Sequence, residues 1–276
     1  KIAEQLINLG IPLELYPRNS YMPEHKGAGS GTWTALCQAL NVQSMEVAEL
    51  IASHKVIPNN LWVAIGLGQW DLVLSFFSQD GTLKDNAGDP GKFQSKQDIL
   101  NDCFAMACHT GRVDLINFLL DKGADINGID HWGMTGLHWA IQCHPELSRY
   151  LIEKGADVRI RDAQHVATQL SWALHFSNNQ LADYMIENCS IDIVDAINLG
   201  KENIVRKILT GDPELVDGQL GLGEPLRMAA KRGNEAIIEI LLSGGANPKI
   251  YDVKTGMFDQ PELKLTALQW AKKNNY

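Results

Sequence analysis

The sequence predicts an all-α solenoid built from stacked helix pairs, and a ladder of small residues is the first observation behind this prediction. Three of the seven intervals between successive ladder positions are 33 residues long. The second observation is that the units open with a helical apolar pattern and several close on Gly-Ala-Asp or Gly-Ala-Asn. A period of about 33 residues is typical of repeats that bury their apolar faces by stacking. The ladder consists of Ala39, Ala64, Ala107, Ala140, Ala173, Ala196, Ala229 and Ala271.

The clearest unit, residues 135–157, shows how each element is encoded. Thr135 stands directly before the first helical pattern, where its hydroxyl can accept a hydrogen bond from an otherwise unpaired amide. Leu137 and Ala140 share one helical face, and the small alanine lets the helix of the neighbouring unit approach closely. Gly155 follows the second helix, at the place where a left-handed residue ends a helix. Two other units have a glycine in this place, Gly123 and Gly245.

These motifs resemble the ankyrin repeat. The clearest unit reads Thr135-Gly-Leu-His-Trp-Ala140 and ends on Lys154-Gly-Ala-Asp157, and the unit before it follows the same pattern from Phe104 to Asp125. The resemblance extends through most of the chain, which is similar to divergent bacterial ankyrin proteins with missing and expanded fingers. It implies an ankyrin-repeat solenoid of about eight helix pairs with incomplete ends, short extended fingers and irregular insertions. It also implies that His138 makes a hydrogen bond that orders a finger.

The ladder also shows where the array departs from a regular repeat. About ten residues are missing between Ala39 and Ala64 and again between Ala173 and Ala196, which is roughly the length of a finger. We therefore expect no finger at these two junctions. Extra residues form irregular stretches, and insertions in solenoids usually map to loops on one face. These loops either bind a partner or have no function of their own. The irregular stretches are residues 17–31, 78–98 and 254–264.

We interpret the whole chain, residues 1–276, as a single ankyrin-repeat domain, because a solenoid grows by contacts between neighbours. Both ends resemble half repeats, so we expect the native protein to extend beyond them. The expected divisions are a partial N-terminal repeat at 1–14, two repeats at 32–77, an insertion at 78–98, five repeats at 99–252, and an insertion with a partial C-terminal repeat at 253–276.

Composition excludes several classes of function. A net charge of −9 repels a phosphate backbone, so nucleic acid is not expected as a ligand. No apolar run approaches the roughly 20 residues of a membrane span, so we expect a soluble protein without a membrane partner. The five cysteines are an odd number without the spacing of a disulfide framework, which favours free thiols in a reducing, cytoplasmic compartment. They are Cys37, Cys103, Cys108, Cys143 and Cys189.

One set of cysteine and histidine residues contains the ligand types of a zinc site. Structural zinc needs four convergent nitrogen or sulfur ligands, usually in tightly spaced pairs. The candidate ligands lack that spacing, so we predict packing thiols, no metal and no cofactor. No catalytic set or phosphate-binding loop stands out, and we expect no enzyme activity. The candidates are Cys103, Cys108, His109, Cys143 and His144.

The positive evidence for function is a column of large apolar residues, two of them tryptophans. The residues directly before three consecutive ladder alanines are Met106, Trp139 and Trp172. By resemblance to ankyrin arrays, this column faces the concave groove between the first helices and the fingers, and helical geometry agrees. Tryptophan anchors in a polar surround are typical of a binding hot spot. The alternative is that these bulky side chains only pack against the adjoining finger. The flanking residues of the predicted surface are His109, Gln142, His175, His131 and Trp132.

We therefore expect a non-catalytic module that binds an unidentified protein partner through its concave face, and we favour a monomer. Two other functions stay open. One is an inhibitor or immunity-type protein that blocks an enzyme, and the other is the substrate-recruiting part of a larger enzyme. The fold by itself does not identify the partner.

Overall fold

The computed structural model describes residues 35–54, 60–88, 95–218, 224–250 and 266–273. The described residues form helices and two isolated β-bridges, with no sheet among them. The all-α prediction is therefore confirmed. Three segments predicted from the sequence lie wholly outside the described residues: the partial repeat at 1–14, the irregular stretch at 17–31 and the insertion at 254–264.

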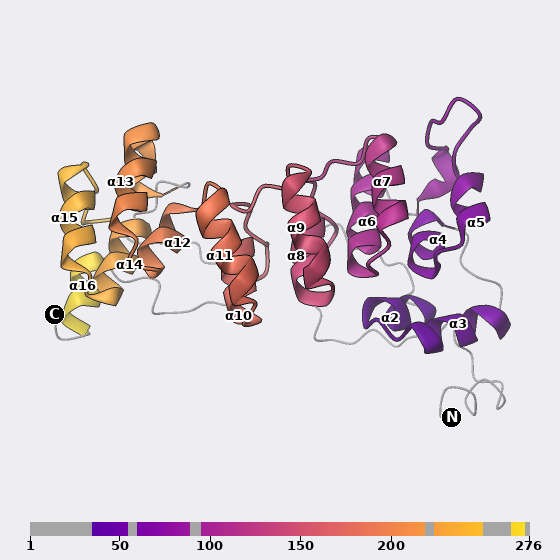
Figure 1. The fold of residues 1–276 in the computed structure, drawn as a ribbon, viewed down its shortest axis with the longest axis horizontal. Coiled ribbons are helices and arrows are strands. Elements are labelled where there is room, and N and C mark those ends of the chain that lie inside the picture. The colour runs from indigo at the N-terminus through magenta and orange to yellow at the C-terminus, as the bar shows by residue number, and fades with distance from the viewer. Residues whose placement is uncertain (1–34, 55–59, 89–94, 219–223, 251–265, 274–276) are drawn as a thin grey trace. The chain divides into compact units, whose positions relative to one another are not determined.

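The helices follow one another as pairs, and the chain divides into two compact units, residues 1–157 and 158–276 (Figure 1). The pairs of the first unit are α2 (Ala35–Asn41) with α3 (Met45–His54), α4 (Leu61–Leu67) with α5 (Trp70–Ser75), α6 (Lys96–His109) with α7 (Val113–Asp121), and α8 (Gly136–Cys143) with α9 (Pro145–Glu153). Those of the second are α10 (Gln169–His175) with α11 (Asn179–Asn188), α12 (Ile193–Asn198) with α13 (Glu202–Gly211), and α14 (Glu224–Arg232) with α15 (Glu235–Ser243), followed by α16 (Ala267–Lys273). The unit boundary falls between repeats, and a single continuous domain stays a prediction.

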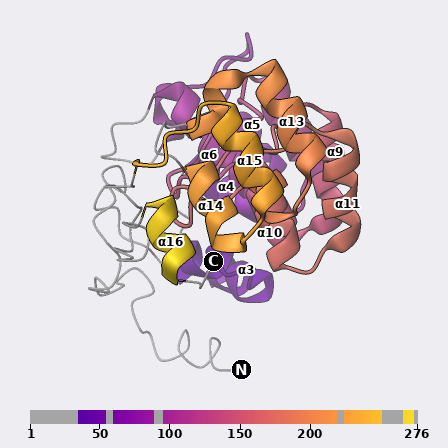
Figure 2. The ribbon, with the colours of Figure 1, turned by 90° about the vertical axis from the view of Figure 1, so that its left-hand side faces the viewer.

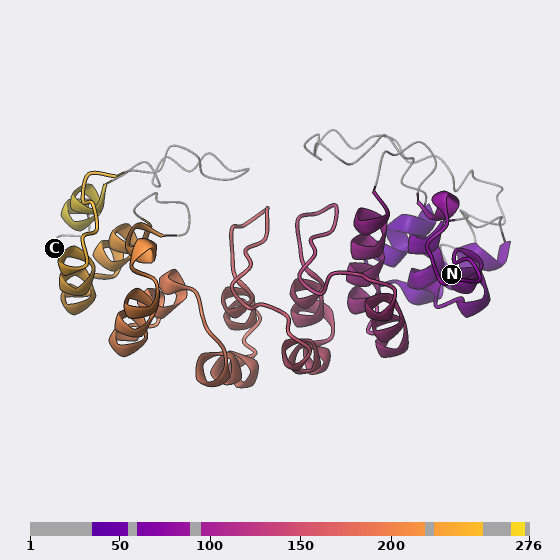
Figure 3. The same ribbon diagram turned by 90° about the horizontal axis from the view of Figure 1, so that it is seen from above.

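Within each unit the first helices of successive pairs pack against one another. In the first unit α6 contacts both α4 and α8, and each of α5, α7 and α9 packs against the first helix of its own pair. Figure 3 shows α9 on one side of α8. In the second unit α14 contacts α12 and α16, while α13 lies beside α15 (Figure 2). The ladder alanines sit at these contacts, where a larger side chain would push the helices apart. Six of them have 0 % exposure: Ala64, Ala107, Ala140, Ala173, Ala196 and Ala229.

Fingers form where the sequence predicts them. Ile129 bridges Thr135 across one finger, and Thr135 is the N-cap of α8 as expected. The Nδ1 atom of His138 accepts a hydrogen bond from the backbone N–H of Thr135 at 3.1 Å, which orders the finger base. The glycines after the second helices have left-handed φ angles: 93° for Gly123, 104° for Gly155 and 97° for Gly245.

One of the two expected fingerless junctions is visible. Helix α11 ends at Asn188 and α12 begins at Ile193, with Asp192 as its N-cap, so too few residues remain to form a finger. The prediction is confirmed at this junction. The other junction, between α3 and α4, includes residues 55–59 and lies outside the described residues.

The insertion expected at residues 78–98 ends earlier than predicted. Helix α6 begins at Lys96, because Ser95 and Asp98 form a capping box in which each side chain accepts a hydrogen bond from the other's backbone N–H. Residues 96–98 therefore belong to the helix. The start of the insertion is an ordered turn, with Phe77 bridged to Leu83 and the short 3₁₀ helix η1 at Asp85–Ala87.

Candidate protein-binding surface

The finger of the first unit is built around a buried carboxylate. The Oδ1 atom of Asp130 accepts hydrogen bonds from the backbone N–H groups of Trp132 and Met134, both at 2.9 Å. Its Oδ2 atom accepts one from the indole Nε1 of Trp139 at 2.7 Å. The first helix α8 and the finger are therefore tied together through a single aspartate. Burial raises the pKa of Asp130 to about 6.

The next finger uses the same device in the second unit. The Oδ1 atom of Asp162 accepts from the backbone N–H groups of Gln164 at 2.8 Å and His165 at 2.6 Å, and Oδ2 accepts from that of Ala167 at 3.1 Å. The indole Nε1 of Trp172 donates to Oδ2 at 3.0 Å. Burial acts to raise the pKa of Asp162, but these hydrogen bonds outweigh it and the pKa is lowered.

Both tryptophans therefore pack against the adjoining finger, as the alternative interpretation proposed, and both remain half-buried. The two interpretations are compatible, because the hydrogen bond uses one edge of the indole and leaves part of the ring accessible. A tethered ring also has fewer orientations to lose when a partner binds.

Two residues of the predicted strip contribute little surface. Met106 is 3 % exposed and His109 is 4 % exposed, so the expectation that they line an open groove is wrong. The reason is that α6 is enclosed by α4, α7 and α8. The His109 ring instead stacks on Trp139, with ring centroids 4.5 Å apart and an interplanar angle of 15°.

The other predicted residues are accessible to different degrees. His131 and Trp132 are half-buried at the finger tip, where the backbone N–H of His131 donates to Asp102 at 2.7 Å. Gln142 and His175 are exposed. Whether any of these residues contacts a partner stays a prediction.

An exposed aromatic cluster in the second unit was not predicted in full. Phe176 and Leu174 follow Trp172 on α10 and its C-cap and are 42 % and 41 % exposed. The Phe176 ring centroid lies 5.6 Å from that of Trp172 and 5.1 Å from that of His175, and His165 meets Trp172 edge-on at 5.7 Å. We call His165, Trp172, His175 and Phe176 the α10 aromatic cluster. The i, i+4 spacing of Trp172 and Phe176 was the available signal.

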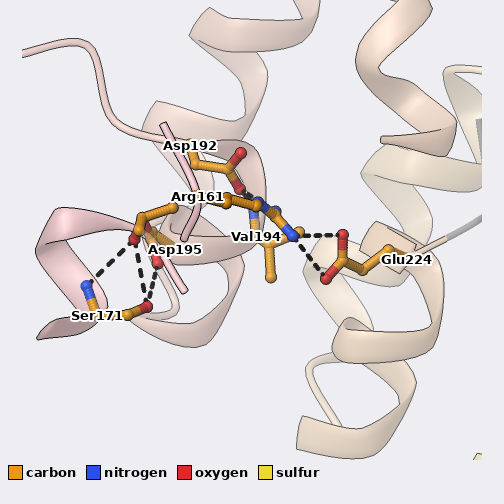
Figure 4. Close-up of polar contacts among 7 residues, drawn as sticks. Arg161, Ser171, Asp192, Val194, Asp195 and Glu224 are labelled. Atoms are coloured by element: carbon orange, nitrogen blue, oxygen red, sulfur yellow. Dashed lines mark hydrogen bonds and ion pairs between the residues drawn. The ribbon is translucent and has the colours of Figure 1, made fainter. Parts of the chain in front are cut away.

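A partly buried ionic network also escaped sequence analysis (Figure 4). Arg161 donates to Asp192 at 2.9 Å and to both carboxylate oxygens of Glu224 at 3.0 and 2.9 Å. Burial lowers the pKa of Arg161, but the two carboxylates raise it overall, so the guanidinium stays charged. These contacts join the residues before α10 to the starts of α12 and α14. They brace the fingerless junction.

Close by, Asp195 occupies the position directly before a ladder alanine but does not face solvent. Its Oδ2 atom accepts a hydrogen bond from the Thr168 hydroxyl at 2.5 Å, and Oδ1 accepts one from the Ser171 hydroxyl at 2.9 Å (Figure 4). Burial raises the pKa of Asp195. The position that carries tryptophan in three other repeats of the sequence is therefore used here for internal packing.

The cysteines carry no sign of chemistry in the described residues. None of the five is in a disulfide bond, and burial raises the pKa of Cys103 and of Cys108, and that of Cys143 to about 11. A thiol with a raised pKa is a poor nucleophile at neutral pH. No group of three or more histidine, cysteine, aspartate or glutamate side chains that could hold a metal ion was found among the described residues. Nor does any helix among them have the length and apolarity to cross a membrane.

Comparison with known proteins identifies the family. A profile described as ankyrin repeats in three copies matches residues 83–162 and 104–196, and the profile of the single ankyrin repeat matches residues 225–253. The chain belongs to the ankyrin repeat family, whose repeats generally serve as protein–protein interaction modules. A solved structure, the human ASB11 ankyrin repeat domain, is 20 % identical with a TM-score of 0.34 over 86 % of this chain and 91 % of that one.

Similar curated proteins differ widely in what they are named for. The ankyrin repeat protein nuc-2 of Neurospora crassa is 30 % identical over 52 % of this chain and 15 % of its own length. An L-asparaginase of Dirofilaria immitis is 25 % identical over 64 % of this chain and 30 % of its own length. The palmitoyltransferase AKR1 of Lachancea kluyveri is 29 % identical over 33 % and 13 %. The chain spans less than a third of each relative, and these relatives, from fungi and a nematode, lend no support to a bacterial resemblance.

Proposed function

We propose that this chain is a non-catalytic module that binds a partner protein through aromatic side chains on its first helices and fingers. The observation that carries the proposal is the α10 aromatic cluster, in which Phe176 and its neighbour Leu174 are each about 40 % exposed. Large apolar side chains with a polar surround are typical of binding hot spots. His165 and His175 supply that surround.

The first unit offers a separate candidate surface of its own. Trp139 is half-buried between its finger and His109, and Trp132 lies at the finger tip with His131 beside it. Gln142 adds an exposed polar group two residues after the ladder position. The orientation of Trp139 is fixed by Asp130 before any partner arrives, so binding costs little side-chain ordering.

The charge of the chain bears on the class of partner. A net charge of −9 favours proteins with basic or mixed surfaces over nucleic acid. We also propose a cytoplasmic location, which the five free cysteines support. The proposal includes a monomeric state, which sedimentation would test directly.

The test compares two exposed apolar side chains of the second unit. Phe176→Ala removes part of the α10 aromatic cluster, and Leu242→Ala on α15 is the matched control, because Leu242 is 45 % exposed. Proteins that co-purify with the wild-type chain are identified, and their affinities for the purified variants are measured by titration calorimetry. A loss of roughly tenfold or more is expected for Phe176→Ala alone, as for a hot-spot residue. Equal affinities for both variants and the wild type would exclude this surface.

A second candidate function is the substrate-recruiting part of a larger enzyme. Two of the similar proteins are named as enzymes, and this chain spans only 13 % and 30 % of them. The complete coding sequence distinguishes the candidates, because a catalytic domain would be visible in it. If one is present, deletion of the repeats should raise the KM for a protein substrate and leave the turnover of a small substrate unchanged.

A further inference from the structure

One contact of the first unit links repeats that are not neighbours. Gln43, in the turn between α2 and α3, donates from its side-chain Nε2 to the backbone carbonyl of His109 at the end of α6. The same Nε2 lies 3.3 Å from Nε2 of His144, the residue between α8 and α9. In a solenoid each repeat normally contacts only its neighbours. This contact passes over the α4–α5 repeat, so it adds a constraint that stacking does not supply.

The turn that carries Gln43 has an unusual backbone. Gln43 has a φ of 54°, a left-handed value that residues other than glycine rarely adopt. Hydrogen bonds from the backbone N–H of Gln43 to Leu40 and from that of Ser44 to Ala39 close the turn. Strained residues of this kind persist where surrounding contacts hold them. The Gln43 side chain has such contacts at its far end.

The hydrogen bonds of the Gln43 side chain require that Nε2 of His144 carries no proton. A single side-chain amide group donates both to a carbonyl oxygen and to Nε2 of His144, which accepts only when it carries no proton. A protonated His144 presents an N–H group to the amide N–H₂, and two donors then face each other. Rotating the amide by half a turn does not help, because its oxygen would then face the carbonyl oxygen of His109. Neither orientation satisfies both partners.

The groups around His144 do not remove this conflict. Its ring lies against Gly111, where an added Cβ would come within 2.8 Å of it, so the ring has little room to move. Glu146 lies 3.4 Å from Nδ1, but this carboxylate has a 76 % exposed side chain and attracts a protonated ring whether or not Gln43 is in contact. His109 is the other titratable group facing it. Burial, and then the charge of His144, lower the pKa of His109 to about 4.

We propose that Gln43, His109 and His144 form an acid-released latch, which holds the α2–α3 pair against the turns that end α6 and α8 and opens when His144 is protonated. The latch does not depend on the proposed partner binding. The stack of α4, α6 and α8 stays folded when it opens, because α6 packs directly against both α4 and α8. Helix α2 remains next to α4, where Leu40 packs against Gly66.

Hydrogen exchange of the full chain, followed by mass spectrometry, tests the latch. Protection factors are measured at pH 7.5 and pH 5.5 and corrected for the intrinsic pH dependence of exchange. In the wild type, the protection of residues 35–54 should fall at least tenfold at the lower pH, while that of α8 should not change. In Gln43→Ala, residues 35–54 should be weakly protected at both values.

Three further variants decide whether His144 is the group responsible. His144→Gln and His144→Asn keep a hydrogen-bond acceptor that does not titrate, so residues 35–54 should be equally protected at both pH values. His175→Gln, which replaces an exposed histidine of the second unit, should behave as the wild type. The proposal is overturned if wild-type protection is independent of pH, or if either His144 variant loses protection as the wild type does.

Discussion

The two fingers that carry a buried aspartate share one tether but expose different surfaces. Asp130 holds Trp139 in the first unit and Asp162 holds Trp172 in the second, each through the indole Nε1. Beside Trp139 the neighbouring ring is the buried His109, whereas beside Trp172 it is the exposed Phe176. The repeat pattern therefore determines how the tryptophan is held, and residues of the surrounding helices determine how much of a binding surface results.

The largest expected effect is a loss of folding stability at low pH, which tests the buried state of His109 beside Trp139. Burial lowers the pKa of His109 to about 4 in the folded chain, below the 6.5 of an unperturbed histidine, so the unfolded chain binds the proton more tightly. Stability is unaffected above pH 6.5 and decreases as the pH falls from 6.5 to about 4, by about 3 kcal/mol in total. Urea unfolding between pH 7.5 and 4.5 should show this loss, and His109→Gln should reduce it.

Other groups titrate in the same range, so the difference between variant and wild type is the informative quantity. Asp130 acts in the opposite direction, because its raised pKa stabilises the folded chain as the pH falls below about 6. His175→Gln is the matched control and should keep the full wild-type dependence. Identical curves for His109→Gln and the wild type would contradict the buried, neutral state of His109.

Overpacking the ladder should have the next largest effect and should be similar in the two units. Ala140→Leu and Ala173→Leu each add a branched side chain where the alanine has no exposure. Each should lower the free energy of unfolding by about 1–3 kcal/mol, measured from the urea midpoint. Unchanged midpoints would show that these alanines do not lie at tight helix contacts.

Removing the hydrogen bond between the indole and the buried aspartate should lower the free energy of unfolding by a smaller amount. Trp139→Phe and Trp172→Phe keep an aromatic ring but delete the indole donor, leaving the carboxylate of Asp130 or Asp162 with one hydrogen bond fewer. Each should lower the free energy of unfolding by about 1–2 kcal/mol in urea, since the carboxylate that loses the indole donor is buried. The Trp139 variant should also shift the pKa of Asp130 further upward, which carbon-13 NMR of its carboxyl group would detect. A pKa that stays the same would mean that the indole does not stabilise the charge.

The smallest effect on stability is expected at the α10 aromatic cluster. Phe176 and Leu174 leave much of their surface in water, so replacing either with alanine creates little cavity. Each variant should change the urea midpoint by an amount equivalent to less than about 0.5 kcal/mol, as for most surface substitutions. A loss above 2 kcal/mol would place these side chains in the core and remove the basis for a binding surface there.

The sequence predicted the features that depend on local pattern and spacing. The ladder alanines, the cap at Thr135 and the short junction before Asp192 all follow from residues close together in the chain. Burial of Met106 and His109 was not predictable in this way, because it depends on three helices that enclose α6. The start of α6 was predictable, since Ser95 and Asp98 have capping-box spacing.

Long-range polar contacts left no signal in the sequence. Arg161 finds its partners 31 and 63 residues away, and the side chain of Gln43 reaches a histidine 101 residues away. Nothing in the spacing of these residues distinguishes them from ordinary surface residues. Their geometry depends on how the repeats stack, which a repeat pattern specifies only approximately.

The ionic network of the second unit also restricts how this array could have grown. Repeat arrays lengthen and shorten by gaining or losing whole repeats, which is harmless when each repeat contacts only its neighbours. Arg161 breaks that independence, because its partners Asp192 and Glu224 begin two different later repeats. Excising the α12–α13 repeat would remove Asp192 and leave the partly buried guanidinium with one carboxylate fewer. The middle repeat could therefore not be lost without breaking a contact that links its two neighbours.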